Sequence, residues 1–83
     1  MSILPAQCRA ARALVDMGQS VLARRAIVSC DMIVDFENGS HTPIASNLVA
    51  IRVALEEAGV IFIDENGEGP GVRLRKKSFG GGV

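Results

Sequence analysis

The stretch Gln19–Pro43, QSVLARRAIVSCDMIVDFENGSHTP, decides the fold, because it joins two short helical patterns through a tight turn. The first pattern predicts a helix over Gln19–Arg25, and residues 26–28 form the turn. Ser29 is expected to cap the second helix, since its hydroxyl can accept a free backbone N–H. The pair Asn38-Gly39 is a strong signal for the end of that helix. Two helices joined by a three-residue turn indicate a helix-turn-helix, the unit that lays its second helix in the DNA major groove.

Helical patterns also precede and follow this stretch. Pro5 suits the first turn of a helix, and the apolar spacing after it predicts a helix over residues 6–17. A fourth helix is expected to begin at Ser46 or a neighbouring cap and to end at Gly59, and residues 40–45 allow a further helical turn. The side chains expected to share one buried core are Leu14, Leu22, Ala23, Val28, Ile33, Phe36, Leu48, Ile51 and Leu55.

The pattern changes after the fourth helix. Residues 60–63, VIFI, are β-branched or aromatic and predict a strand. Residues 64–71 are rich in turn formers, and residues 72–75, VRLR, alternate apolar and basic side chains, as a half-exposed strand does. The sequence therefore predicts a mostly α fold, a bundle of four to five helices containing the helix-turn-helix, with a C-terminal β-hairpin.

The 83 residues are enough for one domain. We divide it into a helix-turn-helix domain over 1–59, a hairpin extension of the same domain over 60–76, and a flexible glycine-rich tail over 77–83. A two-stranded hairpin is marginally stable alone in water, so it must pack on the helices or pair with a second copy. Because an open strand edge invites pairing, we expect a homodimer. The side chains proposed for this dimer contact are Val60, Phe62, Val72 and Leu74.

The composition excludes several classes of protein. Hydrophobic residues make up 48% of the chain, which is too many for a disordered protein. Neither the two cysteines nor any other residue pattern indicates a metal site, a cofactor or catalysis, so we do not expect an enzyme. The sequence shows no signal peptide and no apolar run near the roughly 20 residues of a membrane span, so we expect a cytoplasmic protein without a membrane partner. The formal net charge is zero, whereas DNA-binding domains usually carry a basic surplus.

The chain resembles the phage-repressor and Cro-type family of helix-turn-helix regulators, the XRE family, and its tail is similar to that of small alphaproteobacterial members. In the first half the resemblance rests on Gln19, Leu22, Ala23, Val28, Ser29, Ile33, Asp35-Phe36-Glu37, Gly39 and Thr42-Pro43. It continues through residues 50–52, 54–56, 59–60, 62–67 and 69–75. This resemblance implies a transcriptional regulator that binds a double-stranded DNA operator as a homodimer. Ile27 departs from the family pattern, which usually has glycine there, and a β-branched residue is strained if its φ is positive.

The resemblance also implies which residues contact DNA. The recognition-helix positions are Ser29, Cys30, Asp31, Met32, Val34 and Asp35. The phosphate-binding positions are Gln19, Arg9, Arg12, Arg24, Asn38 and Ser40. Gln19 stands at the start of a helix, where free backbone N–H groups can bind the same phosphate anion.

The charge of the recognition helix leaves a second function open. Base edges are usually bound by amide or guanidinium groups, whereas this helix offers the two carboxylates of Asp31 and Asp35. Carboxylates are repelled by phosphates and can only accept hydrogen bonds, for example from cytosine. The alternative is therefore a degenerate helix-turn-helix protein that binds another protein through this helix, as an antiactivator or inhibitor, and reads DNA poorly or not at all.

Overall fold

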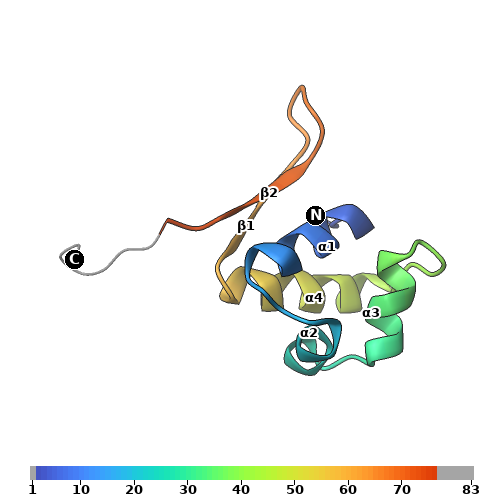
Figure 1. The fold of residues 1–83 in the computed structure, drawn as a ribbon. Helices are drawn as coiled ribbons and strands as arrows, with labels where there is room; N and C mark the ends of the chain where they lie inside the picture. Colours follow the sequence, from blue (N-terminus) through green and yellow to red (C-terminus); the bar gives the residue numbers. More distant parts are fainter. Residues whose placement is uncertain (1, 77–83) are drawn as a thin grey trace, which may run out of the picture.

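The computed structural model describes residues 2–76, and the tail expected over 77–83 lies outside the described residues. This part of the chain forms four helices followed by a two-stranded antiparallel hairpin (Figure 1). The helices are α1 (Pro5–Leu14), α2 (Gln19–Ala26), α3 (Cys30–Glu37) and α4 (Ala45–Glu57), and the strands are β1 (Val60–Ile63) and β2 (Gly71–Leu74). The mostly helical fold with a C-terminal hairpin is thus confirmed, and the fifth helix considered for residues 40–45 is not formed.

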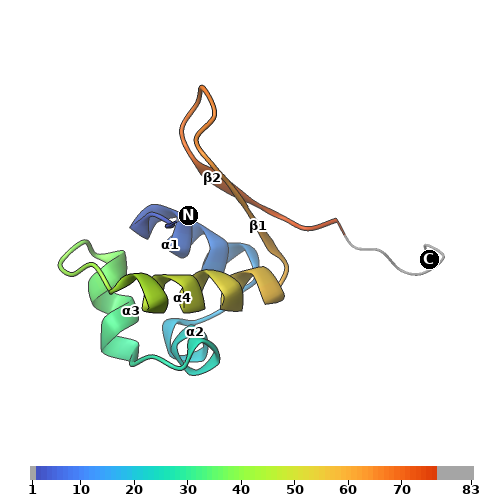
Figure 2. The ribbon, with the colours of Figure 1, turned by 180° about the vertical axis from the view of Figure 1, so that it is seen from behind.

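Helix α4 crosses the middle of the molecule and organises the other elements. Helix α2 packs on one side of α4, while α1 and the hairpin lie on the other side (Figures 1 and 2). Helix α3 lies near the N-terminal end of α4 and packs against α1 and α2 (Figure 1). The hairpin extends beyond the helices, so its tip is the farthest point of the described chain on that side (Figures 1 and 2).

Helix α1 ends three residues earlier than the expected stop at Met17. The chain leaves the helix through Asp16, whose φ of 53° is left-handed, and the Met17 N–H then donates to the carbonyl of Arg12 at 2.9 Å. This change of direction turns the Met17 side chain into the core, where it is 8% exposed. Leu14, which we expected in the core, is 38% exposed, because the helix ends there; beyond it, Met17 is buried and Val15 packs half-buried against the core.

The turn between α2 and α3 forms within one residue of the expected position. Ser29 caps α3, since its Oγ accepts the Met32 N–H at 3.1 Å, and Gly39 follows the helix end with a φ of 83°. Ile27 ends α2 in the left-handed conformation, with φ 59° and ψ 50°. The strain anticipated for a β-branched residue at this position is therefore present, at about 1–2 kcal/mol.

The start of α4 differs from the expected one. The helix begins at Ala45, its N-cap is Ile44, two residues before Ser46, and no side chain caps it. Pro43 stands just before the N-cap, where it is compatible with this start, because a proline disfavours the helical conformation only in the residue before it.

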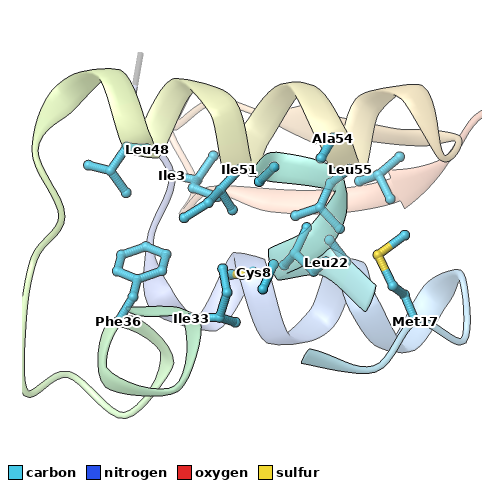
Figure 3. Close-up of a cluster of buried hydrophobic side chains, with 14 of the residues drawn as sticks. Ile3, Cys8, Met17, Leu22, Ile33, Phe36, Leu48, Ile51, Ala54 and Leu55 are labelled. Carbon is cyan, nitrogen blue, oxygen red and sulfur yellow. The ribbon is translucent and has the colours of Figure 1, made fainter. Parts of the chain in front are cut away.

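The core is built from all four helices and β1 (Figure 3). Seven of the nine expected core residues are buried; Leu14 is exposed and Val28 is half-buried against the cluster. The largest side chains that are fully buried are Leu22, Ile33, Ile51, Leu55, Val60 and Cys8. Phe36 is 3% exposed and lies between α3 and the start of α4, close to Leu48 (Figure 3).

The hairpin packs its apolar face on the helices. Val60 lies opposite Leu74, and Phe62 lies opposite Val72. The second strand covers Gly71–Leu74, so it begins one residue before the expected range of 72–75. Val60 is fully buried, Phe62 is 8% exposed and Val72 packs against the core, whereas Leu74 is 51% exposed. Of the four side chains proposed for a dimer contact, three are thus covered within one chain by α1 and α4, and Leu74 remains exposed.

Candidate nucleic-acid interface

The predicted recognition positions lie on the outer side of α3. Cys30, Asp31 and Asp35 are exposed, and Met32 and Val34 are half-buried. Ile33 and Phe36, on the opposite side of the same helix, are buried and hold it against the core. Alternation at helical spacing thus leaves one face of α3 accessible to a partner. The two charges on that face, Asp31 and Asp35, are both negative.

A buried carboxylate anchors α3 to α1 and α2. Glu37 is 3% exposed, and the Arg12 guanidinium binds it with two hydrogen bonds, from Nε to Oε2 and from Nη2 to Oε1, each at 2.7 Å. The Cys8 thiol donates to Oε2 at 3.0 Å, and the Gln19 amide donates to Oε1 at 3.0 Å. Arg9 donates through Nη1 to the backbone carbonyl of Glu37. One carboxylate therefore joins the first three helices.

These contacts set the ionisation of the cluster. Burial acts to raise the pKa of Glu37, but hydrogen bonds from Arg12, Cys8 and Gln19, together with the Arg12 charge, lower it below its ordinary value. The hydrogen bond to Glu37 is also the main reason why the pKa of Arg12 is raised. Burial, reinforced by the carboxylate, raises the pKa of the Cys8 thiol, which stays protonated and can donate.

A hollow of about 520 Å³ opens beside this cluster, between α1, the start of α2 and the end of α3. Its lining brings together four of the six predicted phosphate ligands, together with Val34 and Glu37; the four are Arg9, Arg12, Gln19 and Asn38. Arg24 lies at the other end of α2, outside this lining. Ser40 is bound within its own loop, where its hydroxyl donates to Asn38 Oδ1 at 2.6 Å.

Arg12 lines the hollow, but its guanidinium is engaged within the protein. Besides its two bonds to Glu37, it donates through Nη1 to the Met17 carbonyl at 3.0 Å. All three of its guanidinium nitrogens therefore bind the protein itself, and its positive charge is balanced by a buried carboxylate. Arg9, whose side chain is more exposed, is the better candidate for binding an anion in the hollow.

Sequence reasoning missed the central role of Glu37. The signal that could have found it is its spacing, because Glu37 is four residues after Ile33 and so falls on the buried side of α3. A glutamate on a buried helical face requires a cationic partner. Arg12 was available for that role, but was assigned to phosphate instead.

The chain matches no protein-family model, and no curated protein matches its sequence at a significant level. Within residues 2–76, no group of three or more histidine, cysteine, aspartate or glutamate side chains is arranged to hold a metal ion. None of the helices in that range has the length and apolar character needed to cross a membrane.

Proposed function

We propose that the protein is a DNA-binding transcriptional regulator of the repressor/Cro type. The observation that carries this proposal is the placement of Arg9, Gln19 and Asn38 around one hollow, directly beside the exposed face of α3. Phosphate contacts fix the orientation of a DNA-binding protein, and the adjacent helix reaches the base edges. Gln19 is the first residue of α2, and the free backbone N–H groups at the start of a helix favour an anion.

The charge of the chain determines how such a complex would behave. The chain has zero net charge and Glu37 neutralises Arg12, so no basic surplus is available to bind phosphate. Affinity for duplex DNA should therefore fall with salt, but with a shallow slope, because that slope scales with the number of neutralised phosphates. The complex should also be weaker than that of a basic domain of the same size.

Arg9→Ala tests the phosphate role against a matched control, Arg73→Ala. Both arginines are exposed, but Arg73 lies on β2 and not in the hollow. In a salt titration of duplex binding, Arg9→Ala should weaken binding to every sequence alike and reduce the salt slope by about one, whereas Arg73→Ala should leave both unchanged. Equal losses from the two variants would show that binding is diffuse and that the hollow has no particular role.

A second candidate function rests on the two exposed carboxylates of α3. In a DNA complex Asp31 and Asp35 would lie near the phosphates, which repel carboxylates. These two side chains therefore favour a protein partner bound through this helix. Asp31→Asn distinguishes the two, because removing a carboxylate from a DNA-facing helix should strengthen non-specific duplex binding. If neither the wild type nor Asp31→Asn binds any duplex above background at low salt, the DNA proposal fails and protein binding becomes the better one.

A further inference from the structure

Ile27 combines backbone strain with almost complete exposure. Its φ of 59° is unfavourable for a β-branched residue, and its side chain is 90% exposed, so burial does not offset the strain. The exposed side chains of Arg24 and Arg25 precede it in the last turn of α2. We call these three residues the knob. They present one branched apolar side chain next to two positive charges.

A complementary surface lies between α1 and the hairpin. Two adjoining hollows, of about 270 Å³ and about 310 Å³, share Leu4, Gln7 and Pro70 in their lining. We call them together the socket. The apolar side chains that line it are Leu4, Ala6, Ala10, Pro70 and Val72.

The polar groups of the socket divide into a bonded floor and an acidic rim. Gln7, which lies in the floor, already accepts from the Leu4 N–H at 2.8 Å and donates to the Gly71 carbonyl at 3.0 Å. An apolar group can therefore enter without leaving this amide unpaired. Asp64 and Glu65 line the larger hollow and are exposed. The socket is thus apolar inside and negative at one side.

The knob and the socket lie at opposite ends of the molecule. The connection from α2 to α3 forms one edge in both views, and the hairpin rises from the opposite edge (Figures 1 and 2). One copy cannot fill its own socket with its own knob. A second copy can, with the branched side chain in the apolar hollow and the arginines beside the acidic rim.

We propose that the knob of one copy binds the socket of the next copy. The two contacting surfaces differ, so the contact is head-to-tail and leaves one free knob and one free socket at the ends. Repetition then gives chains longer than a dimer. The surface involved is small, so association should be weak and visible only at tens to hundreds of micromolar protein. This inference goes beyond DNA binding and does not depend on it.

Two variants block the two halves of the contact separately. Ile27→Gly removes the apolar group of the knob and keeps a residue suited to the left-handed conformation. Ala10→Arg fills the socket from an exposed position of α1 and sets a cation against Arg24 and Arg25. Circular dichroism and thermal melting confirm that each variant is folded before its association is measured.

Sedimentation equilibrium without DNA provides the test. The average mass of the wild type should rise with concentration beyond that of a dimer, whereas each variant alone should remain a monomer. An equal mixture of Ile27→Gly and Ala10→Arg should form dimers and nothing larger, because it contains one intact socket and one intact knob. A wild type that stays monomeric at several hundred micromolar, association that stops at the dimer, or a mixture that remains monomeric would each overturn the proposal.

Discussion

Replacing Glu37 by glutamine should destabilise the protein severely, although the two side chains have nearly the same shape. The change leaves the Arg12 guanidinium without its counter-charge, and removing one partner of a buried ion pair costs about 3–5 kcal/mol. The Glu37 side chain is 3% exposed and that of Arg12 is 20% exposed, so partial solvation of Arg12 places the loss near the lower end, at about 3 kcal/mol. For a domain of this size each kcal/mol shifts the melting temperature by roughly 4–8 °C, so a fall of more than 10 °C is expected.

The pH dependence of this variant tests the cause of the loss. Because the pKa of Glu37 is lowered by folding, its stabilisation is present above the unfolded-state value near 4.5 and is lost as the pH falls through the lower folded-state pKa. Melting scans of the wild type should therefore show a loss of stability below about pH 4.5 that is reduced in Glu37→Gln. The difference in melting temperature between the wild type and Glu37→Gln should become smaller as the pH is lowered.

Two further proteins complete the experiment. Arg12→Met combined with Glu37→Leu removes both charges and should be more stable than Glu37→Gln alone. Glu56→Gln breaks the partly exposed pair with Arg52 and should change stability by less than about 1 kcal/mol. The reasoning is refuted if Glu37→Gln melts within a few degrees of the wild type at neutral pH, or if Glu56→Gln is equally destabilising.

Three other substitutions test the local structure by thermal melting. Ile27→Gly should stabilise the protein by about 0.5–1 kcal/mol, because it removes left-handed strain but adds chain entropy to the unfolded state; lower stability would show that the exposed side chain makes a stabilising contact. Gly18→Ser should add about 0.5–1 kcal/mol, since Gly18 is the N-cap of α2, its φ of −76° suits any residue, and a Cβ there would meet nothing within 4 Å. Phe36→Ala should cost about 3–5 kcal/mol, and a melting curve like that of the wild type would mean that Phe36 does not fill the core.

The turn between α2 and α3 was predictable because its signals are local. Ser29 caps the helix that follows it, Gly39 ends that helix in a left-handed conformation, and both effects depend on a few neighbouring residues. The strand at residues 60–63 was predictable for the same reason, since its side chains suit a strand. The second strand was displaced by one residue, because its limits depend on the register with its partner.

The candidate site was less predictable because it depends on contacts between distant residues. Arg12 and Glu37 are 25 positions apart, so no local pattern indicates that they form a pair. The packing of the hairpin also depends on distant residues, and its apolar face was expected to contact a second copy. Its burial on α1 and α4 is a tertiary outcome, which leaves Leu74 as the exposed member of that face.

The different environments of the two thiols give the protein a built-in position for a spectroscopic label. Cys8 is fully buried and donates to Glu37, and both burial and the neighbouring carboxylate keep it in the unreactive protonated form. Cys30 is exposed on the first turn of α3, on the face proposed to meet a partner. A maleimide dye or spin label should therefore attach at Cys30 alone, without any cysteine being mutated. Such a label would report directly on whether DNA or a protein approaches α3.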